Sequence, residues 1–343
     1  MTEKKPVPTL SDVAKRAGVS TATVSRCLNS PDRVIQTTRE RVMEAVQELG
    51  YAPNFAARVM AAKRSNTIGA IIPTMENAIF ARGLQAFQDV LRARGYTLLV
   101  ASSSYSAEIE GEQIRNLVSR GADGLLLIGH DRDPEIERFL AAQNLPIMVA
   151  WTYDDEADVP SIGFDNLHSM QALAEEVIDL GHRQLALITA DTKDNDRARL
   201  RLYGVIEAMK GRGLDPSDLQ ILETTYDIDD GAQAFEVLMQ SRVPPTAVMC
   251  GNDVIAVGAL RQARARGMSV PEDVSITGFD DIELARIAQP ALTTVHVPHR
   301  EMGRKAADAL IDMVERKVSR AKSEKLATLV RMRESLGPPP RRA

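Results

Sequence analysis

The N-terminal part of the chain carries three short runs of apolar residues spaced three and four apart, the spacing of one face of a helix. The first run follows Thr9 and Asp12, whose side chains have the spacing of a helix N-terminal cap, and it ends at Gly18. A second helix is expected to begin at Ser20 and a third to span about residues 38–49. The pattern therefore predicts three short helices around a minimal apolar core, with a tight turn between the first two.

The second of these helices has two different faces. Val24 and Leu28 are four residues apart and are expected to pack inward. The opposite face is small, polar and basic, and it carries Thr21, Ala22, Ser25, Arg26 and Asn29. Only the inward face is therefore expected to join the core.

From residue 67 onward, short apolar runs alternate with helical patterns. The runs read IGAIIP, YTLLVAS, GLLLIG, PIMVAW, QLALIT, QILET, AVMCG and VSITGF. Such alternation is typical of parallel sheets covered by helices. Because roughly 265 residues exceed one comfortable sheet, we expect two doubly wound lobes. The predicted fold class is an all-α helix-turn-helix head joined to an α/β body of two parallel-sheet lobes.

The composition is that of a soluble globular protein, with 44% hydrophobic and 26% charged residues in a chain of 343. The first residues lack the apolar segment of a secretory signal, and no later window approaches the roughly 18 apolar residues of a membrane span. A cytoplasmic location is therefore expected. Cys27 and Cys250 stand far apart without neighbouring metal ligands, so we expect two inert thiols and neither a disulfide nor a metal site.

Charge is divided unevenly along the chain. Residues 1–64 carry 11 Lys and Arg against 6 Asp and Glu, a net charge of +5, whereas the remainder stands at −10. A basic head on an acidic body is expected when only the head contacts a polyanion such as DNA. A chance fluctuation of surface charge is the alternative that composition alone leaves open.

Two neighbouring segments of the head, TLSDVAKRAGVSTATVSRCLN and TRERVMEAVQELGYAPNFAAR, resemble the DNA-binding head of the lactose-repressor (LacI/GalR) family nearly residue for residue. The match covers about 60 residues, far more than a helix-turn-helix pattern alone. The resemblance implies a transcriptional repressor under allosteric control. Its expected parts are a helix-turn-helix domain over 1–52, a hinge helix and linker over 53–65, a two-lobed effector-binding and dimerisation domain over 66–335, and a flexible tail over 336–343.

For the body, the resemblance implies the architecture of periplasmic sugar-binding proteins, in which the chain crosses between the lobes three times. We expect these crossings near Ile162, Ala291 and Ser323. The N-lobe would then comprise residues 66–162 and 292–322, and the C-lobe residues 163–291 and 323–335.

By position in the family, Thr21, Ala22 and Arg26 read base edges in the major groove. Arg26 suits a bidentate contact to a guanine, whereas Ala22 offers only apolar contact. The positions that hold phosphates in the family are Thr9, Ser20, Thr23, Ser25 and Asn29. For each of these, an ordinary helix cap or surface polar residue is the alternative.

The family pattern is broken at Ile35, where related proteins often have a small hydroxyl residue that caps the third helix. The segment after Pro53 resembles the family's hinge helix, which orders on DNA where two copies meet across the minor groove. There the expected DNA contacts are Asn54, Ala57 and Met60, with Met60 in place of the usual leucine wedge. An exposed linker methionine is the alternative.

Ligands of open α/β sheets bind beyond the carboxyl ends of the strands, so two facing lobes create a cleft. The candidate effector residues border this cleft by position in the family: Ile79, Phe80, Trp151, Arg197, Arg201, Tyr226, Asn252 and Asp280. Asp165 is expected to act at the first crossing rather than by touching the ligand. Surface or cap placement is the alternative for each.

Arg197 and Arg201 lie one helical turn apart, so both guanidiniums are expected to reach one ligand. Two arginines favour an anionic effector, such as a sugar acid of the gluconate type, and thus the gluconate-repressor-like branch of the family. The competing interpretation pairs Arg197 with Asp194 or Asp196. The effector class predicted is a small sugar or sugar acid.

Enzyme motifs are not evident, since the chain has no phosphate-binding loop, dinucleotide fingerprint, nucleophile elbow or zinc-protease motif, and its 5 histidines are scattered. No cofactor is expected. A transport sugar-binding protein stays open as a second function, although it would need a signal peptide in place of the basic head. An architectural DNA-binding protein without a ligand is the third.

A regulator of this kind is expected to be a homodimer, because a two-fold axis matches a near-palindromic operator. The chain ends in ESLGPPPRRA, without the heptads of an added coiled-coil helix. A tetramer is therefore not predicted.

Overall fold

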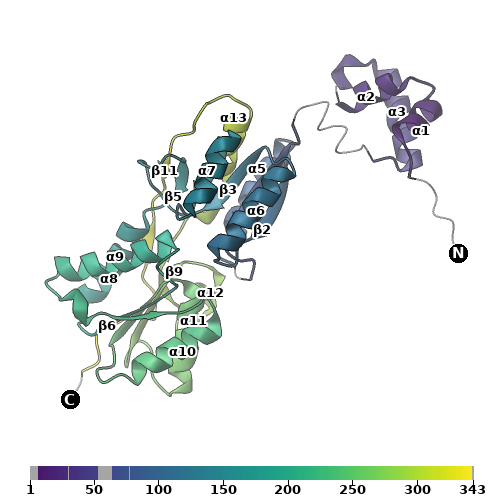
Figure 1. Ribbon diagram of the computed structural model, residues 1–343. Helices are drawn as coiled ribbons and strands as arrows, with labels where there is room; N and C mark the ends of the chain where they lie inside the picture. Colours follow the sequence, from purple (N-terminus) through teal and green to yellow (C-terminus); the bar gives the residue numbers. More distant parts are fainter. Residues whose placement is uncertain (1–6, 30, 53–63, 77, 342–343) are drawn as a thin grey trace. The chain divides into compact units, whose positions relative to one another are not determined.

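The computed structural model describes residues 7–29, 31–52, 64–76 and 78–341. They form two compact units, divided between Ser65 and Asn66. The N-terminal unit, the head, is α-helical, and the C-terminal unit, the body, is α/β (Figure 1).

The head consists of α1 (Leu10–Ala17), α2 (Thr21–Asn29) and α3 (Gln36–Leu49), with a 3-10 turn at Pro31–Arg33. Thr9 caps α1 as its spacing predicts: the backbone N–H of Asp12 donates to Thr9 Oγ1 at 3.3 Å, and the N–H of Thr9 donates to Asp12 Oδ2 at 2.8 Å. Gly18 ends the helix with φ of 64°, a left-handed conformation that favours glycine.

The core of the head is small and takes one fully buried valine from each helix, Val13, Val24 and Val42. Helix α3 begins at Gln36, two residues before the predicted start. Ile35 occupies its N-cap position with φ −61° and ψ 142°, and makes no side-chain hydrogen bond there. The hydroxyl cap expected from the family is therefore missing at this helix.

The first lobe of the body is built on a parallel sheet in the order β11-β5-β4-β3-β1-β2. Its strands are β1 (Thr67–Ile72), β2 (Thr97–Ser102), β3 (Gly124–Ile128), β4 (Ile147–Ala150), β5 (Ser161–Gly163) and β11 (Glu324–Lys325). Its helices are α5 (Ala81–Ala93) and α13 (His299–Val314) on one face, and α6 (Ala107–Ser119) and α7 (Pro134–Gln143) on the other. In β3, Leu126 joins the apolar cluster of α5 and α13, whereas Leu125 and Leu127 join that of α6 and α7, as the two-residue period of a strand requires.

The second lobe repeats this plan with a sheet in the order β12-β10-β9-β8-β6-β7, in which β12 runs antiparallel to β10. Its strands are β6 (Leu185–Thr189), β7 (Gln220–Glu223), β8 (Ala247–Cys250), β9 (Ser275–Asp280), β10 (Thr293–His296) and β12 (Leu329–Arg331). Its helices are α8 (Asn166–Asp179), α9 (Asp196–Gly211), α10 (Ile228–Met239), α11 (Asp253–Ala265) and the short α12 (Glu283–Ile287), with a 3-10 turn at Pro216–Asp218. Leu187 packs toward α8 and α9, and Ile188 toward α10 and α11, so helices cover both faces here too.

The chain crosses between the lobes after β5, after β10 and after β11. The crossing expected near Ala291 is placed too early, because β10 pairs in parallel with β9 and still belongs to the second sheet. The crossing expected near Ser323 is also too early, because Glu324 and Lys325 pair with β5. The positions of both crossings are set by which neighbouring strand β10 and β11 pair with, and the apolar pattern of the sequence does not reveal that pairing.

The segment predicted as a flexible tail begins as packed chain. Leu336 is buried, and the carbonyl of Gly337 accepts a hydrogen bond from His182 Nε2 at 2.8 Å. The N–H of Gly337 donates to Ser275 Oγ at 3.1 Å. The fixed part of the body therefore extends beyond its predicted end at residue 335.

Among the described residues, no helix is long and apolar enough to cross a membrane. In the same part of the chain, no three His, Cys, Asp or Glu side chains gather where they could hold a metal ion. Cys27 and Cys250 are buried free thiols, and burial raises the pKa of Cys250, which keeps that thiol protonated and unreactive.

Candidate functional site

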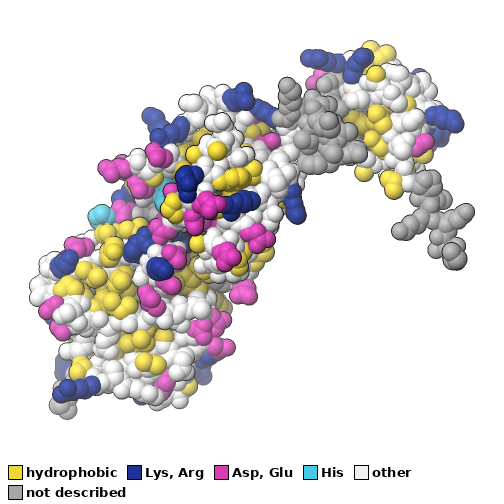
Figure 2. All heavy atoms as spheres, in the orientation of Figure 1, with side chains coloured by type: hydrophobic (Ala, Val, Ile, Leu, Met, Phe, Trp, Pro, Cys, Tyr) yellow, Lys and Arg dark blue, Asp and Glu magenta, His cyan; other side chains and the backbone are white. Residues whose placement is uncertain are grey.

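The outer face of α2 presents the predicted base readers to solvent. Thr21, Ala22 and Arg26 are exposed, while Val24 and Cys27 on the opposite side are buried. Arg26 takes part in none of the ion pairs found among the described residues, so its guanidinium is available for a partner. Lys and Arg side chains also stand out on the surface of the head in Figure 2.

Three of the predicted phosphate contacts lie at the N-terminal ends of helices, and two of them, Thr9 and Ser20, accept a backbone N–H there. Thr9 caps α1, and Ser20 Oγ accepts a hydrogen bond from the N–H of Thr23 at 3.1 Å at the start of α2. The hydroxyls of Ser20 and Thr23 lie 2.9 Å apart. These residues therefore shape the N-terminal ends of two helices, where backbone N–H groups favour anions. Ser25 is half-buried on α2, and Asn29 is its last residue.

The three predicted hinge contacts, Asn54, Ala57 and Met60, lie outside the described residues.

In the body, all eight predicted effector residues line one small chamber between the lobes, which we call the deep chamber. Its lining is Ile79, Phe80, Tyr105, Trp151, Arg197, Arg201, Tyr226, Asn252 and Asp280, and its volume is about 20 Å³. Most follow the carboxyl end of a strand, and the two arginines extend from α9. The strand-end rule thus brings residues from five separate parts of the sequence together.

Arg201 is the fixed cation of the deep chamber. Its Nε donates to Asn166 Oδ1 at 2.9 Å, its Nη1 donates to the carbonyl of Gly251, and its guanidinium stacks on the ring of Phe279 at 3.8 Å. Its Nη2 lies 3.9 Å from Asp280 Oδ1, the distance of a loose ion pair. Because the hydrogen bonds and the stacked ring set the side chain in one orientation, Arg201 is pre-arranged to meet a ligand.

Three buried polar groups of the deep chamber have no hydrogen-bond partner in the described part of the chain. They are both carboxylate oxygens of Asp280, Nδ2 of Asn252 and Nε1 of Trp151. Their residues are 1%, 0% and 2% exposed. Buried polar groups are nearly always hydrogen-bonded. The two acceptor oxygens of Asp280 and the N–H donors of Asn252 and Trp151 are therefore suited to bind a polar ligand.

The backbone at two of these residues is unusual. Asp280 has φ of 104° and Trp151 has φ of 63°, both in the region that non-glycine residues rarely adopt. Such conformations cost roughly 1–3 kcal/mol each and concentrate at functional sites. The two strand ends are therefore held in positions that aim Asp280 and Trp151 into the chamber.

A buried carboxyl supports the loop that carries Asp280. Asp253 accepts hydrogen bonds from Thr294 Oγ1 at 2.6 Å and from the N–H of Ile282 at 2.8 Å. Burial raises the pKa of Asp253 well above its usual range, despite the hydrogen bond from Thr294. Asp253 therefore ties α11 to β10 and to the chain just past Asp280.

Arg197 is occupied by protein rather than left free for an anion. Its Nη1 lies 2.9 Å from Asp196 Oδ1 and donates to the carbonyl of Ile128 at 3.0 Å. The alternative that paired Arg197 with Asp196 is the one the structure displays. The observation that favoured an anionic effector, two unpaired arginines, is thereby removed.

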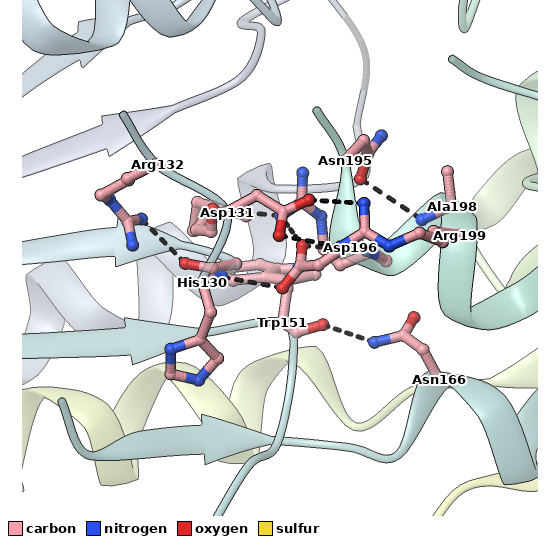
Figure 3. Close-up of polar contacts among 12 residues, drawn as sticks. His130, Asp131, Arg132, Trp151, Asn166, Asn195, Asp196, Ala198 and Arg199 are labelled. Carbon is pink, nitrogen blue, oxygen red and sulfur yellow. Dashed lines mark hydrogen bonds and ion pairs between the residues drawn. The ribbon is translucent and has the colours of Figure 1, made fainter. Parts of the chain in front are cut away.

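Contacts across the cleft join the start of α9 to the end of β3 (Figure 3). The N–H of His130 donates to Asp196 Oδ2 at 2.7 Å, and Arg199 makes two hydrogen bonds to the carboxylate of Asp131, at 2.7 and 2.8 Å. A side chain on Gly129 would collide with Arg197 and Asp196, and its φ of 77° also favours glycine. These contacts hold the lobes closed on this side.

Nearer the crossings, the Asn166 amide donates to the carbonyl of Trp151 at 3.0 Å, so α8 is tied to the end of β4. Asp165 caps α8 and pairs with Lys325 at 2.7 Å, joining two crossing strands. Asp165 does not line the deep chamber. Its expected place at the crossing is the one it occupies.

Two larger spaces adjoin the deep chamber. The outer chamber, of about 530 Å³, is lined by Thr74, Met75, Glu76, Ser102, Ser104, Tyr105, Ala190, Asp191, Asp194, Asn195, Thr224, Thr225, Tyr226 and Asp227. A side chamber of about 470 Å³ lies between α6, α7 and the start of α9, and includes Arg132, Lys193 and Arg197. Tyr105 lines all three spaces.

Sequence reasoning missed Tyr105, Asn166 and the role of Phe279. Tyr105 follows the run YTLLVAS and obeys the same strand-end rule as the residues that were found, so the rule would have identified it. Asn166 and Phe279 act through Arg201, a pairing that only the folded chain reveals.

The model of the lacI family of bacterial regulatory proteins matches residues 9–54, and that of the periplasmic binding protein-like domain matches residues 174–336. The chain is 35% identical over 308 residues to the transcriptional repressor CytR of Escherichia coli K12, covering 90% of both chains. It resembles the lac repressor dimer bound to operator and the anti-inducer ONPF, with a TM-score of 0.84, 27% identity and coverage of 96% of this chain and 99% of that one. It also resembles the complex of the regulator CelR with cellobiose, with a TM-score of 0.70, 30% identity and the same two coverages.

These matches cover both the head, with its exposed α2 face, and the body, with its unsatisfied chamber between the lobes. The protein belongs to the lacI family of bacterial transcriptional regulators.

Proposed function

We propose that this regulator represses transcription as a homodimer on a near-palindromic operator, and that a small carbohydrate-type effector, a sugar or sugar acid bound between the two lobes against the residues of the deep chamber, changes its affinity for that operator. Thr21, Ala22 and Arg26 are the proposed base readers, with Thr9, Ser20, Thr23, Ser25 and Asn29 at the phosphates and Asn54, Ala57 and Met60 at the hinge. Binding, not catalysis, is the activity assigned to the chamber.

The observation that carries the effector site is the set of buried polar atoms without partners on Asp280, Asn252 and Trp151. Neighbouring hydroxyls of a sugar are both donors and acceptors, so they match a carboxylate beside two N–H groups. Arg201 adds a fixed donor group, and the rings of Phe80 and Trp151, 5.2 Å apart, supply an apolar wall. A polar floor with aromatic walls is the usual composition of a site for a small ligand.

Known relatives support this reading, because solved structures of the family hold cellobiose, ribose or operator DNA. A transport protein would share the body, yet the family's DNA-binding segment is present at residues 9–54. An architectural DNA-binding protein would have no use for a chamber with unsatisfied groups.

The test is a titration of the full-length protein with a panel of sugars, followed through Trp151, the single tryptophan. Binding should change its emission, because the indole N–H gains a partner. Asp280→Asn should weaken binding at least tenfold, since the loss of a charge-assisted hydrogen bond costs about 1.5–3 kcal/mol. Asp218→Asn, an exposed carboxylate on the same lobe, is the matched control and should bind as the wild type does. If an effector alters operator binding while Asp280→Asn retains full affinity for it, the proposed site is wrong.

A further inference from the structure

The strand end that carries Asp280 continues directly into a second strained residue. Asp280 has φ of 104° and Asp281 has φ of 54°, so two consecutive residues other than glycine adopt left-handed backbone. This conformation is rare outside glycine, and it persists only where surrounding contacts hold it. The turn after β9 therefore depends on contacts that offset its strain, and those contacts decide where the Asp280 carboxylate points.

The carboxylate of Asp281 makes two such contacts. Its Oδ1 accepts a hydrogen bond from Arg333 Nη2 at 2.5 Å, and its Oδ2 lies 2.8 Å from His296 Nδ1. The side chain of Asp281 is 10% exposed, so solvent screens these contacts little. Both oxygens of Asp281 are thus used within the protein, whereas both oxygens of its neighbour Asp280 have no partner in the described part of the chain.

The two partners of Asp281 are fixed by their own strands. His296 is the last residue of β10, and Arg333 follows β12, the edge strand that pairs with β10. Arg333 Nη1 also donates to the carbonyl of Leu292 at 2.8 Å, and the N–H of Arg333 donates to Thr293 Oγ1 at 2.8 Å. Because this guanidinium is anchored at both its backbone and its side chain, it holds the Asp281 carboxylate against the sheet.

From the proposed effector function, on which this step rests, we infer that Asp281 is a positioning residue for effector binding. Its carboxylate, bonded to His296 and Arg333, holds the left-handed turn in which Asp280 faces the deep chamber. Without that hold, the turn relaxes toward the ordinary negative φ and the Asp280 carboxylate leaves its place in the chamber. Asp281 lines none of the three chambers, so it acts only through Asp280.

Calorimetry on the full-length protein tests the inference, with D-ribose, cellobiose and D-gluconate as the first probes and the tightest binder used for all variants. Asp281→Ala should raise the dissociation constant at least tenfold. Asp281→Asn should stay within threefold of wild type, because asparagine tolerates left-handed backbone and its amide can replace both hydrogen bonds.

Glu236→Ala is the matched control. Glu236 belongs to the same lobe, and its carboxylate also has two partners, Arg266 at 2.6 Å and Gln262 at 2.7 Å. It lines none of the three chambers, and its loss should leave the dissociation constant unchanged.

A double-mutant cycle separates positioning from other effects of the substitution. If Asp281 acts through Asp280, then Asp281→Ala should change the dissociation constant less than threefold in a protein that already carries Asp280→Asn. A carboxylate that acts by another route would weaken binding by the same factor in both proteins. Additive effects, or wild-type affinity in Asp281→Ala, would overturn the inference while leaving the proposed function intact.

Melting curves identify any variant that fails to fold. Should Asp281→Ala fail, His296→Ala against His296→Asn decides the matter. The alanine variant removes one contact of Asp281 and should weaken binding at least threefold, whereas the asparagine variant places an amide N–H where Nδ1 stands and should not. Equal affinities of these two variants would overturn the inference.

If no sugar or sugar acid binds the wild-type protein, the proposed function fails, and hydrogen exchange then tests the turn by itself. The N–H of Ile282 donates to Asp253 Oδ2 at 2.8 Å, one residue beyond Asp281. Its exchange should be at least tenfold faster in Asp281→Ala than in Asp281→Asn. Equal exchange in the two variants would mean that the Asp281 carboxylate does not hold the turn.

Discussion

At the scale of single residues, the chamber is held by contacts that use one polar atom of a side chain and leave another for the ligand. Asn252 Oδ1 accepts the N–H of Ile255 at 2.9 Å and caps α11, while Nδ2 stays unsatisfied. Each such group costs about 1–3 kcal/mol when it is buried without a partner. A ligand that supplies the missing partners recovers this free energy on binding. The same unsatisfied groups therefore lower the stability of the body without effector and raise its affinity for effector.

Arg26 gives the residue-scale prediction for the head. Arg26→Ala should lose about 1–3 kcal/mol of discrimination at one base pair, because no other exposed basic residue lies on this face of α2. Salt-sensitive binding to unrelated DNA should persist, since phosphate contacts carry it. The measurement is fluorescence anisotropy with operator variants at a fixed salt concentration. Unchanged preference at every base pair would remove Arg26 from the base readers.

At the scale of elements, the sequence predicts where strands end, but it does not predict which of the two sheets a strand joins. The apolar runs place Trp151, Asn252 and Asp280 at carboxyl ends, and parallel sheets collect such ends at one edge whatever the order of the strands. Whether β10 pairs with β9 or continues into the first lobe depends on hydrogen bonds between distant segments, and the local sequence is the same in either case. The extended packing of Leu336 was missed for the same reason.

Pairing of Arg197 shows the same limit within one helix. Spacing along α9 puts Arg197 and Arg201 on one side, as predicted. Which partner each selects depends on Gly129 and Ile128 of the other lobe, which the sequence around Arg197 does not reveal.

The link between Asp131 and Arg199 is an element-scale feature with a measurable effect. It joins the end of β3 to α9, both side chains are about 30% exposed, and a partly screened pair of this kind contributes about 1 kcal/mol at most. Asp131→Asn should therefore weaken effector binding by up to about fivefold through a faster dissociation rate, because the closed state loses a contact that the open state lacks. Stopped-flow fluorescence of Trp151 measures that rate.

A matched pair within one lobe provides the control. Arg212 makes the same two-bond contact to Asp179, at 3.0 and 2.9 Å, but both residues belong to the second lobe. Asp179→Asn should leave the dissociation rate unchanged. If the two variants behave alike, the contact across the cleft has no part in holding the effector.

At the scale of the whole molecule, the effector chamber and the head belong to different compact units, so their coupling must appear as a free energy between two binding reactions. If saturating effector changes the operator dissociation constant by some factor, saturating operator must change the effector dissociation constant by the same factor. Couplings of this kind typically lie between about 5-fold and 150-fold.

The two factors can be measured independently, by anisotropy of labelled operator and by fluorescence of Trp151, at one salt concentration because DNA affinity depends steeply on salt. We expect equal factors in wild-type protein. In Asp280→Asn, the effector concentration that produces half of the change in operator affinity should rise at least tenfold, because this variant binds the effector more weakly. A change in operator affinity without a matching change in effector affinity would mean that the ligand acts elsewhere than in the deep chamber. A half-effective concentration that Asp280→Asn leaves unchanged would place the coupled site outside it as well.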